Sequence, residues 1–502
     1  MNLFEKTIAI ASPRLAYERY MWRMSVKGLE KSYDAGNDGR LNAGWRVVNS
    51  SAESTDKMYR DTMRARSRDL ERNSDILESI LLAFERNVVG TGFKLQAKTH
   101  DEQLNVQIEA LFKEWARPKY CDITKQQSFA ELCQMIARRK RVDGAVVIVK
   151  RYNANGYIPL VLQVFEVDEL DTMMPASSGK RIVGGIEYDE FNCPVAYYIK
   201  KYDIYGLYTG NSERINANDV MFLYKKKRPS QIREITELST TLPRVRDTNQ
   251  FMEAVSVKER IAALLAVFIR RASPEGGGYG RSANAKELKT YEGKSMTPGM
   301  MMELNPGDDV SVVQPPAQGA SAADFVRLQQ RLSGSAQGIS YEVTARDMSQ
   351  VNYSSARQGL LEDNKTYTME QDYLKEHFLK EVYEEFIEAA VLSGKLKIRD
   401  YFENKEEYLK HEWVAPGMKW IDPLKEANAN KVQLATCQTT LQDVASGQGA
   451  DWRELIDQRA IEIQYMKAKG VISVDGEIDE ESKKLIEQDE SKDGIDEKKS
   501  ND

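Results

Sequence analysis

The chain has 502 residues, a length that suggests about three domains, and 41% of them are hydrophobic, enough for several small cores. Its formal net charge is −6, but residues 471–502, the acidic tail, carry 12 Asp/Glu and 5 Lys, a net of −7. The remainder is therefore nearly neutral, at +1 (−6 minus −7). This balance excludes a protein that grips nucleic acid over its whole surface, and any contact with DNA should be local or weak.

Cysteine usage and hydropathy indicate the compartment. No pair of cysteines has CxxC spacing, which argues against a zinc module or a disulfide framework and suits a reducing environment. The most apolar run, 261–269, is too short to span a bilayer, and the N-terminus lacks a signal-peptide pattern. We therefore expect a soluble, intracellular product with no membrane partner. The four cysteines are Cys121, Cys133, Cys193 and Cys437.

The first half of the chain predicts an arm and then an α+β domain. Residues 1–50 combine aromatic and basic side chains with a loop rich in Gly and Asn, as in an extended arm that needs a neighbouring surface. Apolar spacing predicts helices at 54–86, 102–116 and 129–141, the first ended by the glycines at 90 and 92. A mostly antiparallel sheet should follow, with strands at 145–149, 160–165, 185–188, 195–200 and 220–224.

The second half is largely helical. A helix is predicted at 243–271, a mixed insertion with short β-prone pieces (301–304, 310–313) at 281–318, and a shorter helix at 322–337. A polar loop then leads into a long helix ending at Gly394, about 57 Å long at 1.5 Å per residue. Ser355 and Gln358 have the spacing of a capping box at its start. A turn-rich junction (413–423), helices at 424–446 and 451–469, and a disordered acidic tail complete the prediction.

Motifs for catalysis are missing. The three histidines show neither ligand spacing nor an HExxH pattern, and neither a Walker A loop nor a GxSxG elbow is present. The glycines of 276–280 lack the Lys-Ser/Thr of a phosphate loop, so a hinge is favoured. We expect no catalytic residue, metal or cofactor.

Four acidic residues form the best enzymatic candidate, because a two-metal nuclease needs clustered carboxylates at strand ends. They follow the strand at 160–165, but no further acidic or histidine pattern supports metal binding. A solvated loop is therefore the favoured interpretation. The residues are Glu166, Asp168, Glu169 and Asp171.

Three polar segments could contact DNA or a partner. Basic runs at 138–141 and 225–228 could each contact phosphates, pair with carboxylates of a neighbouring subunit, or simply end a helix, which is the natural interpretation of the first run. The loop before the long helix is polar without being strongly charged, so it could touch a polyanion without holding it; an ordinary connector is the alternative. Its polar residues are Thr344, Arg346, Asp347, Ser349, Gln350 and Asn352.

Six groups of segments, in register over about residues 54–460, resemble portal proteins of the lambda-like tailed-phage family. The chain departs from this pattern at 232–242, which lacks an expected glycine-containing stretch, and in its acidic tail. The matching segments are RSRDLERN (66–73) with NVVGTG (87–92), DG (143–144), GIEYD (185–189) with PVAYY (194–198), RPSQ (228–231), SYE (340–342) with VNYSSAR (351–357), and WVAPG (413–417) with IDPLKE (421–426).

The resemblance implies an α+β subunit with an α/β wing, a helical stem, a small β-containing clip and a helical crown, which assembles into a ring. Carried onto this sequence, the parts are an N-terminal arm (1–53), the wing (54–240), a stem helix (241–272), the clip (273–319), a second stem helix (320–338), the tunnel loop (339–353), the long wing helix and junction (354–420), the crown (421–470) and the disordered acidic tail (471–502).

The implied function is that of a non-enzymatic DNA channel for genome packaging and ejection at one capsid vertex, which also nucleates capsid assembly. The implied partners are further copies in a ring of twelve, sliding double-stranded DNA, the terminase large subunit, the major capsid protein and a head-completion or adaptor protein. The implied location of the protein is the portal vertex of the virion, which it reaches after assembly in the host cytoplasm. The polar loop residues above would line the channel, and Tyr279, Arg281, Lys286 and Lys289 in the clip would dock terminase and the head-completion protein.

Two other classes remain open. One is an enzyme of the packaging apparatus, a nuclease or ATPase, which the missing motifs disfavour. The other is a capsid-interior scaffold, which should be mostly helical, whereas 144–224 is rich in predicted strands.

Overall fold

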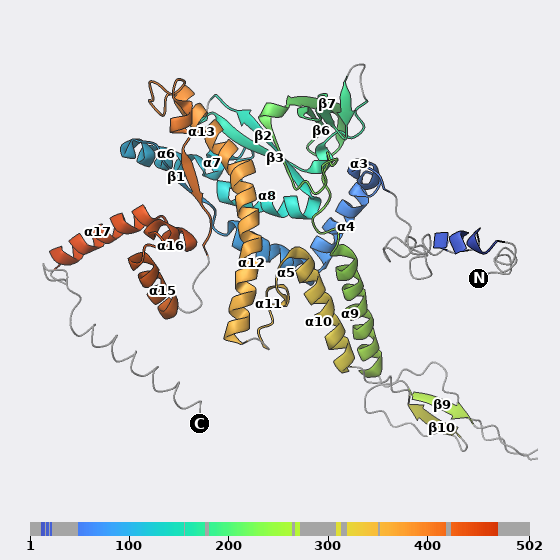
Figure 1. Ribbon diagram of the computed structural model, residues 1–502. Helices are drawn as coiled ribbons and strands as arrows, with labels where there is room; N and C mark the ends of the chain where they lie inside the picture. Colours follow the sequence, from blue (N-terminus) through green and yellow to red (C-terminus); the bar gives the residue numbers. More distant parts are fainter. Residues whose placement is uncertain are drawn as a thin grey trace, which may run out of the picture. The chain divides into compact units, whose positions relative to one another are not determined.

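The computed structural model describes residues 12–15, 17–19, 21–22, 49–154, 156–175, 180–263, 267–271, 308–312, 319–349, 352–417 and 423–469. The chain divides into two compact units, Met1–Thr55 and Asp56–Asp502. A short helix, α3 (Ala52–Asp56), lies at this division, and the elements below belong to the second unit (Figure 1).

The prediction of one continuous helix at 54–86 is wrong, because the structure has two helices there. The first, α4 (Arg60–Asn73), ends where Ser74 adopts extended backbone, and the second, α5 (Asp75–Phe84), starts there. Ser74 acts as the N-cap, its Oγ accepting a hydrogen bond from the Leu77 N–H at 3.4 Å, which is the role that serine favours over a helix interior. A π-helical turn, η2 (Glu85–Val89), follows and ends at Gly90, as predicted.

The next two predicted helices are confirmed as α6 (Glu102–Trp115) and α8 (Phe129–Asp143), with a short α7 (Pro118–Cys121) between them. Ser128 and Glu131 form a capping box at the start of α8. Gly144 ends that helix in the left-handed region, at φ +92°, which costs glycine no Cβ clash.

Two antiparallel sheets confirm the predicted α+β class. One has the order β3-β2-β8, from β2 (Ala145–Tyr152), β3 (Leu160–Phe165) and β8 (Val220–Tyr224). The other has the order β4-β5-β6-β7, from β4 (Arg181–Val183), β5 (Ile186–Tyr188), β6 (Pro194–Tyr202) and β7 (Tyr208–Asn216). Single 3-10 turns, η3 (Val167–Glu169) and η4 (Ala217–Asp219), connect strands. All five predicted strands are present, and β4 and β7 are additional.

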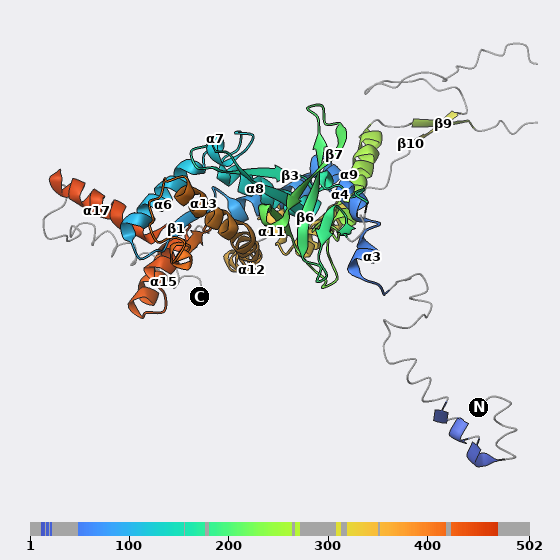
Figure 2. The same ribbon diagram turned by 90° about the horizontal axis from the view of Figure 1, so that it is seen from above.

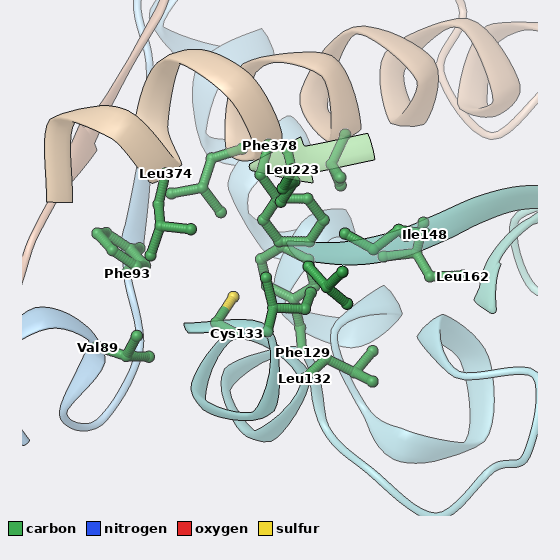
Figure 3. Close-up of a cluster of buried hydrophobic side chains, with 14 of the residues drawn as sticks. Val89, Phe93, Phe129, Leu132, Cys133, Ile148, Leu162, Leu223, Leu374 and Phe378 are labelled. Carbon is green, nitrogen blue, oxygen red and sulfur yellow. The ribbon is translucent and has the colours of Figure 1, made fainter. Parts of the chain in front are cut away.

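Strand β2 separates two hydrophobic cores, because its side chains alternate between the faces of the sheet. Val146 and Ile148 face the larger core with α8, and Val147 and Val149 face a smaller core beneath the four-stranded sheet. Figure 3 shows Phe129, Leu132 and Cys133 of α8 gathered with Ile148, Leu162 and Leu223 of the sheet and with Phe378.

The long helix is confirmed, with one irregularity. It consists of α12 (Tyr353–Leu374), a π-helical turn η5 (Lys375–Leu379) and α13 (Lys380–Leu392), and Gly394 follows at φ +72°. Its buried face supplies Phe378, Val382 and Phe386 to the larger core, where the Phe386 ring lies 5.1 Å from that of Phe112. The predicted apolar period therefore points at the core, as expected.

A sheet of two short strands was not predicted. The strand β1 (Lys94–Ala97) pairs antiparallel with β11 (His411–Val414), so that Leu95 lies opposite Trp413. The prediction that 413–423 is a turn-rich junction is thus wrong at its first two residues, because they pair with a strand that is distant in the sequence. A short α14 (Lys405–Tyr408) precedes β11.

The helices around the insertion, α9 (Leu242–Ala263) and α10 (Gly319–Gln337), lie side by side (Figures 1 and 2), with the rings of Phe251 and Phe325 at 4.5 Å. The prediction of helix through 271 is wrong, because β9 (Val267–Arg271) pairs with β10 (Asp308–Val312). The run of Val, Phe and Ile in β9 suits a strand once a partner is present. The β-prone piece at 310–313 is confirmed by β10, and 301–304 lies outside the described residues.

Three C-terminal helices replace the two predicted. They are α15 (Pro423–Ala435), α16 (Leu441–Gly447) and α17 (Trp452–Ala468). The predicted helix at 424–446 is broken by Cys437, at φ +55°, and by Thr440, which caps α16 through Asp443. The helix at 451–469 is confirmed. Among the described residues, no helix is both long and apolar enough to cross a bilayer.

Candidate functional site

The predicted tunnel loop contains a helix that the sequence did not reveal. Residues 341–345 form α11 (Tyr341–Ala345), which packs against α10 and α5. Of the remaining loop residues before the long helix, the structure describes 346–349 and 352, and these lie outside a helix. Gln350, one of the predicted contact residues, lies outside the described residues.

The base of this loop is fastened to α12. Ser340 donates two hydrogen bonds to the Asp363 carboxylate, from its N–H at 2.7 Å and its Oγ at 2.6 Å. Burial raises the pKa of Asp363 despite these bonds. Gly338, at φ +73°, accepts a hydrogen bond from the Thr366 hydroxyl at 2.7 Å. The chain therefore enters the loop from a fixed position on the long helix.

Thr344, one of the predicted contact residues, is buried, so its predicted role is wrong. Its side chain is 2% exposed, and its Oγ1 donates to the Ser340 carbonyl at 2.8 Å. It also packs tightly on α10, because a Cβ added to Gly334 would lie 2.3 Å from Thr344 Oγ1. Thr344 thus holds α11 against α10 and is not on the exposed surface of the loop, where the sequence placed it.

Arg346 and Asp347 present opposite charges on the loop. Arg346 is exposed and adopts the left-handed region at φ +54°. Asp347 accepts hydrogen bonds from the Ser349 N–H at 3.0 Å and from the Tyr341 hydroxyl at 3.2 Å. These bonds lower the pKa of Asp347, so its carboxylate is charged at neutral pH. The loop offers one cation beside one fixed anion.

Asn352 begins the long helix, and the predicted capping box of Ser355 and Gln358 is wrong. The Asn352 Oδ1 accepts a hydrogen bond from the Ser355 N–H at 2.8 Å, which makes Asn352 the N-cap and Ser355 a residue of the first turn. The Gln358 amide donates to Glu362 at 3.3 Å instead of reaching back. Asparagine ranks among the best N-cap residues, so the helix gains by starting earlier.

The first basic run, 138–141, is a structural ion-pair network and not a phosphate contact. Arg138 bonds Glu71 at 2.6 Å and Glu78 at 2.5 Å, and Lys140 bonds Glu370 of α12 at 2.8 Å. Burial opposes ionisation of Glu370, yet the nearby charges of Lys140 and Arg141 outweigh it and hold its pKa at about 2. These basic side chains therefore form ion pairs with carboxylates of the same subunit.

Arg141 extends this network to the helices beside the insertion. Its Nη1 donates to Gln337 Oε1, at the end of α10, at 2.9 Å. Gln337 Nε2 in turn donates to the Thr241 hydroxyl, just before α9, at 2.8 Å. The ends of α9 and α10 nearest the loop are therefore bound to α8 by buried hydrogen bonds.

The predicted carboxylate cluster is engaged in ion pairs and turns. Asp168 pairs with Arg64 at 2.8 Å and with Arg68, which also contacts Glu166 at 3.1 Å. Glu169 accepts from the backbone of its own turn, and Asp171 accepts from Ser212 at 2.5 Å. Within the described ranges no group of three metal-ligating side chains is found. The favoured interpretation as a solvated loop is therefore wrong in detail, because these carboxylates are paired within the fold and Asp171 is buried.

The predicted clip residues Tyr279, Arg281, Lys286 and Lys289 lie outside the described residues.

Comparison with known proteins gives the family. The model of the phage portal proteins of the lambda family matches residues 38–371. The chain belongs to this family, which confirms the resemblance seen in the sequence. It is thus a portal protein of a phage-like particle, and proteins of this class are generally structural rather than catalytic.

Curated relatives match along most of their length. A probable portal protein of Halomonas phage phiHAP-1 is 24% identical over 466 residues, covering 88% of this chain and 88% of the relative. Portal protein B of Escherichia phage lambda is 19% identical over 448 residues, covering 81% and 84%.

Solved structures with a similar chain include the neck of a native gene transfer agent particle computed with C12 symmetry. That chain is 13% identical, with a TM-score of 0.44 over 79% of this chain and 94% of the other. A chain in the virion of the native particle is 12% identical, with a TM-score of 0.43 over 76% and 93%.

Proposed function

We propose that the protein assembles into a ring of twelve copies at one vertex of a capsid and forms the channel through which DNA is packaged and ejected. The observation that carries this proposal is the family match, which spans 38–371 and so includes the three-stranded and four-stranded sheets, the insertion and the polar loop. The virion vertex is its final location, after assembly in the host cytoplasm.

Exposed apolar side chains on the helices support assembly with identical copies. Leu328 and Leu332 lie one turn apart on α10, with 53% and 39% of each side chain exposed. On α17, Ile461 and Tyr465 are likewise one turn apart, at 60% and 64%. Paired apolar residues on separate helices fit a head-to-tail interface that closes into a ring.

The parts of the subunit follow the family layout. The wing is 54–240, the clip is 273–319, the tunnel loop is 339–353 and the crown is 421–470, which includes α15, α16 and α17. The stem comprises 241–272 and 320–338, and the first of these ranges contains the helix α9 (Leu242–Ala263) and the strand β9 (Val267–Arg271).

The loop acts on DNA through weak contacts. Arg346, Asp347, Ser349, Gln350 and Asn352 are the proposed contact residues, and Thr344 only supports them. A single arginine beside a carboxylate neutralises few phosphates, so each contact breaks readily and the duplex can slide. Repetition around the ring makes the sum of these contacts a guide rather than a clamp.

Docking partners are assigned to other parts. Tyr279, Arg281, Lys286 and Lys289 in the clip would contact the terminase large subunit during packaging and a head-completion protein afterwards. The major capsid protein would assemble around the wing, which makes the ring the nucleus of the capsid. These assignments derive from the family and the positions of the residues in the sequence.

Negative-stain microscopy of the purified full chain tests the proposal. Rings with a central hole are expected. Compact monomers or fibres under conditions that preserve the helical signal in circular dichroism would contradict it.

A further inference from the structure

The second basic run, residues 225–228, forms an exposed loop that the proposed function does not use. It directly follows β8, and the side chains of Lys225, Lys226, Lys227 and Arg228 are all exposed. In the first basic run, by contrast, Arg138 and Lys140 are held in ion pairs inside the fold. We refer to residues 225–228 as the basic loop.

The backbone of the basic loop is held by one buried side chain. Gln231 is 4% exposed, and its Oε1 accepts a hydrogen bond from the Lys227 N–H at 2.9 Å. Its own N–H donates to the Arg228 carbonyl at 3.0 Å, which closes the turn. Its Nε2 donates to the Arg233 carbonyl at 2.9 Å and anchors the turn to the interior. The RPSQ motif thus holds the backbone of the basic loop in a fixed turn.

The ammonium groups of two residues on this turn, Lys226 and Lys227, are available to a partner. Lys225 is engaged, with its Nζ 3.3 Å from Glu370. In the part of the chain that the structure describes, no carboxylate makes an ion pair with Lys226 or Lys227. Adjacent cations on a fixed turn repel each other, so an anionic partner would gain from both charges. The loop fits a flexible polyanion.

The chain itself contains a matching polyanion. Between residues 475 and 481 of the acidic tail, five of seven residues are Asp or Glu and none is basic. Because α17 ends at Ala468, the far end of this segment, residue 481, can extend at most about 45 Å beyond that helix. A segment joined to the same assembly has an effective concentration in the millimolar range, so it is favoured over a free polyanion of similar charge.

We infer that the basic loop is the docking site for the acidic tail of this protein, residues 471–502. Docking holds the tail by salt-sensitive ion pairs to Lys226 and Lys227 and covers the exposed cations of the loop. This inference does not depend on ring formation or on the tunnel loop.

Nuclear magnetic resonance of the full-length, ¹⁵N-labelled protein tests the docking directly. A tail that moves independently of a large particle gives sharp amide signals, whereas a docked tail shares the slow tumbling of the particle and its signals broaden. We expect signals of 471–502 to be broadened at about 0.1 M salt and to sharpen at 1 M, where the Debye length falls from about 10 to 3 Å.

Substitutions distinguish the basic loop from general charge attraction. The double change Lys226→Gln and Lys227→Gln should sharpen the tail signals at low salt, and Lys226→Arg with Lys227→Arg should leave them broad. The matched control is Lys119→Gln with Lys125→Gln, two exposed lysines on another part of the chain, and it should leave the signals broad. Neutralising the acidic residues at 475–481 should sharpen them without altering the loop.

Three outcomes would overturn the inference. The first is sharp tail signals in the unmodified protein at low salt. The second is equal sharpening in the basic-loop and control variants. The third is that affinity for a 30-base-pair duplex, measured on the full chain by fluorescence anisotropy, depends on Lys226 and Lys227 while the tail signals are sharp, which would make the basic loop a DNA contact.

Discussion

At the scale of single residues, the polar loop is defined by its hydrogen bonds more than by its charges. Ser340 and Asp363 fix its start, and Asn352 fixes its end. The sequence showed a polar segment before a helix but could not show which residue caps it, since Asn352 and Ser355 are both good caps. The buried partner Asp363 decides the position of the start and lies far along the helix.

Substituting the cap tests this assignment. Asn352→Ala should destabilise the subunit by about 1 kcal/mol, the usual value of an N-cap, and Asn352→Asp should restore it. Gln358→Ala should have almost no effect, because its amide bonds only Glu362. Thermal unfolding followed by circular dichroism measures both, and a larger loss for Gln358→Ala would favour the capping box first predicted.

Removing the buried carboxylate Glu370 tests the ion-pair network. Glu370→Gln should be strongly destabilising at pH 7, by roughly 3–5 kcal/mol, because Lys140 is then left buried with one fewer partner. The same change at the exposed Glu362 is the control.

The pH dependence of that effect has a definite sign. The folded pKa of Glu370, about 2, lies below the ordinary glutamate value of 4.5, so its stabilising contribution is fully present above about pH 5. The contribution is lost as the pH falls from 4.5 towards 2. Urea unfolding at pH 7 and at pH 3 should show the penalty of Glu370→Gln shrinking, and an unchanged penalty would contradict the assigned pKa.

At the scale of elements, strands with apolar alternation were predictable and strands made by pairing were not. The strands at 160–165 and 220–224 match the prediction to the residue, because their side chains fill cores on the two faces of one sheet. Strand β7 is polar over most of its length, and β1 has only four residues. Both become strands because they pair with other strands, and the local sequence pattern does not show which strand will be the partner.

Replacing the loop tests its role as an element. Exchanging 346–351 for a Gly/Ser segment of equal length keeps the connection between α11 and α12 and removes the charged contacts. Rings should still assemble, while packaging or retention of DNA should fall, measured as nuclease-protected DNA per particle. The matched control replaces the exposed turn at 203–206 with Gly and Ser. Normal packaging and retention would show that 346–351 is only a connector.

At the scale of the whole molecule, charge is divided between a nearly neutral body and a strongly acidic tail. Within the body, many arginines and lysines are consumed by internal pairs, as Arg138 and Lys140 illustrate. Counting basic runs in the sequence overestimates the cations available to DNA, because their partners come from α4, α5 and α12. This division suits a conduit, since a surface with few free cations resists a moving polyanion least.

Assembly should depend on apolar residues that a single subunit leaves exposed. The double change Leu328→Glu and Leu332→Glu places two charges on α10, where the proposed neighbour would bury them. Because every interface in a ring is the same, every interface would contain these charges. Size-exclusion chromatography with light scattering should then show monomers or small oligomers instead of rings, with an unchanged circular dichroism spectrum. Ser335→Glu, at an exposed polar position of the same helix, should leave assembly intact. If the double variant formed rings of normal size, α10 would not lie in the interface, and the exposed face of α17 would be the next candidate.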